Sequence, residues 1–199
     1  MDLFTALAPY LRRLVVDIPF RDFDIADIFE TQALLRDAFS KLTALETFCN
    51  VRDELFLDLI HPRNHIRERW EWTTWPNLKT LALYNKDVST DGFWAELGRL
   101  EGLETLVFTR ADGLDEVDMK VEWKKHCKDE RRGLEIVLVN VQSGHREVAG
   151  RERWKDKDKI RITEVNVPTS YYGDDDPICL CQDWVKRRML RGEPPTEWN

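Results

Sequence analysis

The sequence lacks the short motifs that identify the common phosphate-binding and acyl-transfer enzymes. It contains no Gly-x-Gly-x-x-Gly, no Walker-type phosphate loop and no Gly-x-Ser-x-Gly turn. Nucleotide, dinucleotide and esterase chemistry therefore have no support from motifs. We expect no cofactor and assign no catalytic residue.

Long apolar runs and cysteine pairs are also missing. No stretch of about 18 apolar residues occurs, so no membrane-spanning helix is predicted. The first charged residue is Asp2 and no basic segment precedes the short apolar stretch that follows, which argues against a secretory signal. Four cysteines in 199 residues are too few for a disulfide framework. We expect a cytoplasmic or nuclear protein that has reduced thiols and no membrane partner.

Residues that bind metals do not gather at useful spacings. The densest groups are Cys179-x-Cys181 and His126-Cys127. A structural zinc site needs four ligands, commonly supplied by Cys-x-x-Cys pairs, and no such pair is present. We therefore predict no metal site and interpret these cysteines as ordinary thiols.

The charge balance is acidic. The chain has 30 Lys and Arg against 37 Asp and Glu, a net charge of −7. Broad nucleic-acid binding needs a basic face, so we expect no nucleic-acid partner. A hydrophobic content of 42% and a charged content of 34% are typical of a globular protein. At this length the chain is predicted to form a single domain over residues 1–199.

The clearest positive feature is a repeated phrase. Residues 75–85 read WPNLKTLALYN and residues 100–110 read LEGLETLVFTR, and both contain Leu-x-x-Leu-x-apolar. This spacing is a leucine-rich repeat signature. We call its three apolar positions the frame. Frame positions are assigned to Leu11, Leu14 and Val16; Leu45, Phe48 and a degenerate Asn50; Leu78, Leu81 and Leu83; Leu103, Leu106 and Phe108; and Leu134, Val137 and Val139.

The spacing of the strands predicts the fold class. Anchors at Leu14, Leu45, Leu78, Leu103, Leu134 and Ile160 are 31, 33, 25, 31 and 26 residues apart. Helices are expected at 31–42, 89–100, 111–133 and 178–192, the last as a closing helix, and a charged loop at 143–159. Strands that alternate with helices indicate a parallel sheet. We predict an α/β protein, a short irregular leucine-rich-repeat-like solenoid with helices on its convex side. An open two-layer or three-layer α/β sheet is the alternative.

Eight tryptophans are many for this length. One interpretation is that most of them fill the core and the seams between repeats. The other is that some line an aromatic pocket.

The positions between the frame residues are predicted to carry function. Strand side chains alternate, so these residues point away from the frame, onto the concave face. An exposed apolar column on that face indicates a partner or ligand surface. The alternative is that the closing helix or the 143–159 loop covers it. The predicted binding residues form three columns: Thr80, Thr105 and Ile136; Ala82, Val107 and Leu138; and Tyr84, Thr109 and Asn140.

The phrases LKTLALYNKDVSTDGFWAELGRLEGLETLVFTRADGL and RRGLEIVLVNV resemble the leucine-rich region of fungal F-box-like proteins. The resemblance covers most of residues 40–192. It implies a repeat region that recognises a protein client, which an F-box then links to a ubiquitin ligase. Met1 runs almost directly into the first predicted strand, so we expect no F-box ahead of it.

Two functions follow as hypotheses. The first is a protein–protein interaction module of the substrate-recognition type, with a protein client on the concave face. The second is a cofactor-independent enzyme of fungal specialised metabolism that holds a hydrophobic small molecule there. It would be a cyclase, a pericyclase such as a Diels–Alderase, or an isomerase, and it requires a closed aromatic-lined pocket with a buried polar group.

The first hypothesis makes a direct prediction about the apolar column. If that column is exposed, Val107→Asp and Leu138→Asp will each abolish client capture and leave the fold intact. Circular dichroism and a capture assay on the same samples check this. Two folded variants that still capture the client would contradict the assignment of the surface.

Overall fold

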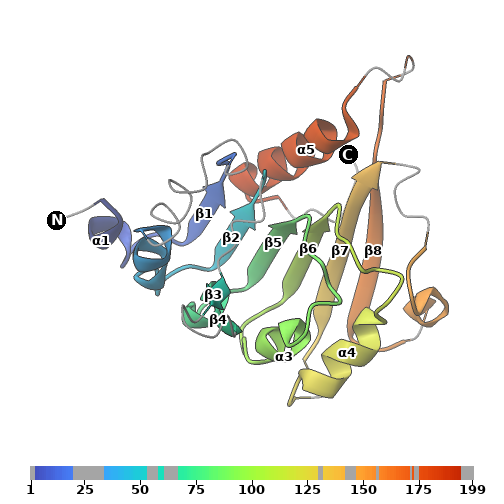
Figure 1. The fold of residues 1–199 in the computed structure, drawn as a ribbon, viewed down its shortest axis with the longest axis horizontal. Helices are drawn as coiled ribbons and strands as arrows, with labels where there is room; N and C mark the ends of the chain where they lie inside the picture. Colours follow the sequence, from blue (N-terminus) through green and yellow to red (C-terminus); the bar gives the residue numbers. More distant parts are fainter. Residues whose placement is uncertain are drawn as a thin grey trace.

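A computed structural model describes residues 3–19, 34–52, 58–60, 67–129, 132–141, 147–155, 157–170, 172 and 175–193. Its centre is a six-stranded sheet in which every neighbouring pair of strands is parallel. The strands follow one another across the sheet in chain order (Figure 1). They are β1 (Arg13–Val16), β2 (Thr47–Asn50), β5 (Thr80–Tyr84), β6 (Thr105–Thr109), β7 (Leu134–Val141) and β8 (Ile160–Val167). The predicted α/β class and parallel sheet are confirmed.

The remaining elements are short, apart from the last helix. A small antiparallel pair forms from β3 (Asp58–Ile60) and β4 (Arg67–Trp70). Residues 34–40 are helical. The other helical elements are α1 (Leu3–Leu7), η2 (Glu71–Thr74), α3 (Phe93–Gly98), α4 (Met119–His126), η3 (Arg151–Lys155) and α5 (Pro177–Arg191).

The frame residues of the first four strands lie in register. The second frame position pairs across β1, β2, β5 and β6 as Leu14, Phe48, Leu81 and Leu106. The third pairs Leu83 with Phe108. Because side chains alternate along a strand, these residues share one face of the sheet. The predicted frame is therefore confirmed for these strands.

The frame face packs on an aromatic core. Phe39, Phe48 and Trp75 contact one another, with ring centroids 4.7–6.3 Å apart. Phe93 lies 6.0 Å from Phe108, and so links α3 to β6. Trp72, Trp75, Trp94 and Trp123 are all at most 4% exposed. These four tryptophans fill the core, as the first interpretation predicted.

The predicted frame of β7 is wrong by one residue. Leu106 pairs with Ile136 and Phe108 with Leu138, so Ile136 and Leu138 face the aromatic core. Val137 and Val139, assigned to the frame above, face the other way. The error has a physical cause. The run LEIVLVNV is buried on both faces, so it shows no polar alternation from which the register can be read.

The second face of the sheet is covered by α5. Cys181, Val185 and Met189 of this helix share a buried cluster with valines of β6, β7 and β8. Figure 1 shows α5 crossing the sheet, while α3 and α4 lie against its other face. α5 therefore lies apart from the helices on the predicted convex side, and the sheet has helices on both faces. Of the two interpretations of the apolar column, the structure shows the one in which the closing helix covers it.

Charged groups hold α5 beside the ends of β1 and β2. Lys186 forms an ion pair with Asp17, and Arg52 pairs with the same carboxylate at 2.7 Å. The hydrogen bond from Arg52 and the attraction of Lys186 outweigh burial and lower the pKa of Asp17. At the other end Gly192, at φ 72°, closes the helix beside the guanidinium of Arg13.

Two predicted helices are shorter than expected. In place of 89–100, α3 begins at Phe93, because Ser89 and Thr90 bond to Asp87 in the preceding turn and do not cap the helix. In place of 111–133, α4 begins after Asp118, whose carboxylate caps it. The helix expected at 178–192 is α5.

The charged loop predicted at 143–159 is partly described, without residues 143–146 and 156. Its described part holds η3, and it packs beside α4. The amide of Ala149 bonds to the carbonyl of Leu114, and Arg151 and Arg153 pair with Glu164 and Asp118.

The covering helix reverses the expectation for Val107→Asp. Val107 is fully buried between β6 and α5, so a carboxylate there has no water and no partner. We expect a loss of more than about 3 kcal/mol in the free energy of unfolding. Thr105→Asp is the matched control, because Thr105 lies on the same strand and face but is half-buried, and it should cost less than about 1 kcal/mol. Urea unfolding of both variants checks this, and equal losses would contradict the placement of α5.

Candidate functional sites at the lower edge of the sheet

The nine predicted binding residues separate into three groups. Ile136 and Leu138 lie in the aromatic core, so their placement on the concave face is wrong. Ala82, Val107, Tyr84 and Thr109 occupy the predicted face but are at most 5% exposed. Asn140 belongs with Ile136 and Leu138, because Val139 and Val141 on either side of it face the valine cluster, so its placement on the concave face is also wrong. It is 8% exposed, and its side-chain oxygen accepts hydrogen bonds from Arg110 and from the amide of Val141. Only Thr80 and Thr105 are half-buried.

Thr80 and Thr105 belong to a row that α5 leaves partly open. Thr47 pairs with Thr80, and Thr80 with Thr105, so three threonines stand side by side on β2, β5 and β6. Arg13 continues the row on β1. We call these four residues the threonine row. A cavity of about 180 Å³ lies over it, closed on one side by Met189, Gly192 and Glu193 at the end of α5.

The side chains of the threonine row are available for binding. Among the described residues, none hydrogen-bonds to the hydroxyls of Thr47, Thr80 or Thr105. Just outside the row, Glu46 accepts ion pairs from Lys79 at 2.9 Å and Arg12 at 3.0 Å. The hydrogen bond from Lys79 is the main reason that the pKa of Glu46 lies below its ordinary value. This edge therefore presents hydroxyl groups bordered by ion pairs.

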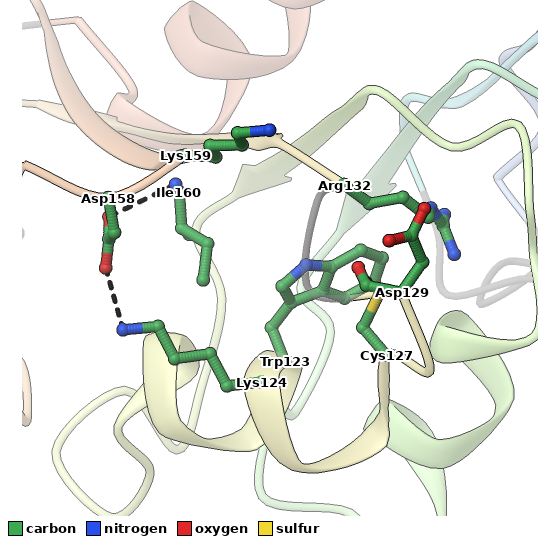
Figure 2. Close-up of a pocket in the computed structure, with 8 residues that line it drawn as sticks. All are labelled: Trp123, Lys124, Cys127, Asp129, Arg132, Asp158, Lys159 and Ile160. Carbon is green, nitrogen blue, oxygen red and sulfur yellow. Dashed lines mark hydrogen bonds and ion pairs between the residues drawn. The ribbon is translucent and has the colours of Figure 1, made fainter.

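A second cavity lies between the end of α4 and the beginning of β8 (Figure 2). Its volume is about 240 Å³. We call it the Trp123 pocket, because the indole of Trp123 forms one wall and is 1% exposed. Arg132 stacks over this ring at 5.2 Å and donates to the carbonyls of Gly98 and Leu100. Its lining residues are Trp123, Lys124, Cys127, Asp129, Arg132, Asp158, Lys159 and Ile160.

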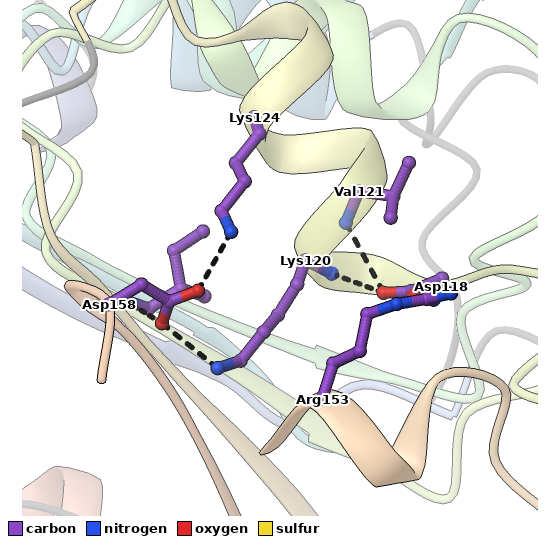
Figure 3. Close-up of polar contacts among 7 residues, drawn as sticks. Asp118, Lys120, Val121, Lys124, Arg153 and Asp158 are labelled. Carbon is purple, nitrogen blue, oxygen red and sulfur yellow. Dashed lines mark hydrogen bonds and ion pairs between the residues drawn. The ribbon is translucent and has the colours of Figure 1, made fainter. Parts of the chain in front are cut away.

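A buried ion pair supports one side of this pocket. Lys120 on α4 is 1% exposed, and its ammonium group lies 2.9 Å from one oxygen of Asp158. Lys124, one turn later, lies 2.8 Å from the other oxygen, so both lysines share one carboxylate (Figure 3). Burial raises the pKa of Asp158. The hydrogen bonds from Lys124, Lys120 and the amide of Ile160 outweigh this, and the net pKa is lowered.

The N-terminal end of α4 is also held by a second carboxylate. Asp118 accepts hydrogen bonds from the amides of Lys120 and Val121 at 3.0 and 3.2 Å, which caps the helix. It also forms an ion pair with Arg153 of η3 (Figure 3). Gly150 lies against this carboxylate, where a Cβ atom would come within 2.2 Å of it. Two carboxylates therefore fix the helix that supplies Trp123.

The cysteines are poor candidates for nucleophiles. Burial raises the pKa of Cys181 to about 11, and burial also raises the pKa of Cys49. The hydrogen bond to Asp176 raises the pKa of Cys179. A thiol attacks as the thiolate, so these groups are protonated and weakly reactive at neutral pH. Among the described residues, no three His, Cys, Asp or Glu side chains gather as a metal site.

Sequence reasoning missed Trp123, Lys120 and Asp158 as a group. Lys120 and Asp158 are 38 residues apart, and no periodic pattern connects them. The available signal was weak: α4 carries Lys120 on the same side as the buried Met119 and Trp123.

No described helix has both the length and the apolar character needed to cross a bilayer.

Comparison with family models, curated proteins and solved structures finds no match for this chain. The resemblance to the repeat region of fungal F-box-like proteins therefore stays a prediction.

The shared carboxylate predicts the response to mutation at Asp158. Asp158→Asn leaves the buried ammonium group of Lys120 without a counter-charge, and we expect a loss of about 3–5 kcal/mol in the free energy of unfolding. Glu122→Gln on the same helix is the control, because its contacts with Lys125 at 3.4 Å and with His126 at 3.3 Å are long and accessible to water, and together they should contribute no more than about 1 kcal/mol. Urea unfolding measures both.

The stability difference between wild type and Asp158→Asn also depends on pH. Because folding lowers the pKa of Asp158, its stabilisation is complete above its ordinary value of 3.8 and is lost as the pH falls through the folded value. The stability difference between wild type and Asp158→Asn should therefore shrink below about pH 4. A difference that stays constant from pH 6 to pH 2 would contradict the pairing.

Proposed function

We propose that this protein is a recognition module built on a leucine-rich-repeat-like framework, and that it binds a protein partner at the threonine row. The observation that carries the proposal is the alignment of three threonines on neighbouring parallel strands, whose hydroxyls have no hydrogen-bond partner in the described part of the chain. A row of side chains across parallel strands is the surface that repeat proteins offer to partners.

The repeat-like framework is supported by more than strand order. Equivalent strand positions recur every 25 to 34 residues from Leu14 to Ile162. β5 and β6 are both followed by a residue in the left-handed region, Asn85 at φ 49° and Arg110 at φ 53°. Asp87, just after β5, and Asp112, just after β6, form an isolated parallel β-bridge through their backbones. Two successive units thus leave the sheet through the same turn.

The proposed surface is smaller than the one predicted from the sequence. α5 covers the predicted columns that contain Val107 and Thr109. Of the predicted surface, the row at the beginning of the strands is the part that can meet a partner while α5 is in place. Threonine hydroxyls both donate and accept hydrogen bonds, and they offer little apolar area. A partner segment rich in backbone or side-chain amides suits such a row better than an apolar helix.

Protein recognition ranks above the cofactor-independent cyclase, pericyclase or isomerase. That alternative requires a closed pocket lined by tryptophan and tyrosine. The Trp123 pocket supplies one tryptophan and a buried polar atom, which keeps the alternative open. Its described lining is otherwise mainly charged, which suits binding of a charged group better than folding of an apolar substrate.

The test removes the hydroxyls and keeps the shape. The triple variant Thr47→Val, Thr80→Val and Thr105→Val should fold as the wild type does, because each change replaces a half-buried hydroxyl by a methyl group of similar size. Partner binding should weaken at least about tenfold, as expected for the loss of one to two hydrogen bonds. Capture from an extract of the source organism, measured by quantitative mass spectrometry, identifies the partner.

Thr163→Val is the matched control, since Thr163 is a half-buried threonine of β8 outside the row. It should capture the partner as the wild type does. Equal capture by the triple variant and the wild type would overturn the proposed surface. Retention of a small molecule with no protein partner would favour the enzyme hypothesis.

A further inference from the structure

The Trp123 pocket holds a buried hydrogen-bond donor that has no acceptor. The indole nitrogen of Trp123 is buried and makes no hydrogen bond to any residue that the structure describes. In Figure 2 it lies at the edge of the ring that faces Ile160. Trp75 donates to the carbonyl of Phe39 at 2.8 Å and Trp94 to that of Val88 at 3.0 Å, whereas the indole nitrogen of Trp154, like that of Trp123, finds no acceptor among the described residues. Buried donors are nearly always paired, so an unpaired one beside a cavity indicates an acceptor that binds there.

The charges around the cavity favour an anionic acceptor. Its lining has three cationic side chains, Lys124, Arg132 and Lys159, and two carboxylates. One of the carboxylates, Asp158, is already shared by Lys124 and the buried Lys120. A negative group that enters beside the indole nitrogen therefore meets an excess of positive charge in a partly desolvated site, where charge interactions are stronger than in water.

Size and lining limit the kind of anion. A volume of about 240 Å³ equals that of about eight waters at roughly 30 Å³ each, so the ligand is compact. Ile160 and Cys127, at 4% and 7% exposure, give one side of the cavity an apolar surface. The end of α4 that reaches the pocket is its C-terminal end, whose carbonyls disfavour negative charge, so a singly charged anion suits the pocket better than a doubly charged one. These features suit a carboxylate on a short apolar body better than a phosphate dianion, which binds at helix N-termini.

We infer that the Trp123 pocket is a binding site for a compact organic carboxylate. One carboxylate oxygen accepts the indole N–H of Trp123, and the charge faces Lys124 and Lys159. The short carbon chain lies against Ile160. The site is separate from the threonine row, so the inference does not depend on the proposed function.

The experiment follows the indole N–H resonance of Trp123 in the ¹⁵N-labelled full chain while butyrate, a carboxylate on a short apolar chain, is titrated. The resonance is assigned by its loss in Trp123→Phe, and by triple-resonance spectra if that variant does not fold. We expect a saturable shift with butyrate and none with neutral butyramide. Lys159→Gln, a change at an exposed residue, should weaken binding by about tenfold, as for the loss of one charge-assisted contact.

The resonance of Trp184, on the opposite face of the sheet, is the internal control and should not move. Three results would overturn the inference. They are no shift with butyrate, equal shifts with butyrate and butyramide, or a saturable shift with inorganic phosphate where butyrate gives none. An unchanged affinity in Lys159→Gln would remove that lysine from the site and contradict the stated role of the charge.

Discussion

The structure depends on burying both faces of one parallel sheet. The middle strands are apolar on both sides, and a sheet of this kind is stable only when each face is covered. The frame residues pack on an aromatic core formed with α3 and α4. The valines on the other side need a second cover, and α5 provides it. Burying one large apolar side chain contributes about 1.5–3 kcal/mol, against a typical net stability of about 5–15 kcal/mol. The last helix is therefore part of the fold and not an appendage to it.

This constraint also determines where binding can occur. Lys186 of α5 pairs with Asp17, which also binds Arg52, just after β1 and β2 end. The helix itself ends near Arg13, at the beginning of β1. The row at the beginning of the strands stays open beside its last turn. On the other face, Asp118 and Asp158 fix α4 so that Trp123 borders a cavity. Both candidate sites thus lie where the strands begin, beside the C-terminal ends of α5 and α4.

The sequence predicted the parts of the fold that rest on short-range periodicity. Leu14, Phe48, Leu81 and Leu106 were placed in one row because alternation and repeat spacing agree in those strands. β7 was misplaced by one residue because its two faces are equally apolar, so periodicity carries no register there. Thr80 and Thr105 lie on the face opposite the frame, as the alternation in their strands predicts, so they are still candidate binding residues.

What the sequence could not predict depends on long-range docking. The closing helix was expected, but the face it covers follows from the burial of valines in three strands, which a repeat pattern does not specify. The pairing of Lys120 with Asp158 depends on how α4 packs against β8, and a lysine at this spacing is more often solvated. The Trp123 pocket exists only through that packing.

The central claim, that α5 covers the valine face, is tested most directly by methyl nuclear Overhauser spectroscopy. The account predicts cross-peaks from the methyl groups of Val185 and Met189 to those of Val107 and Val137, because all four side chains share one buried cluster. If these cross-peaks are missing and the methyl group of Val107 is accessible to a soluble paramagnetic probe, then α5 does not cover the sheet. In that case the full apolar column would again be the leading binding surface.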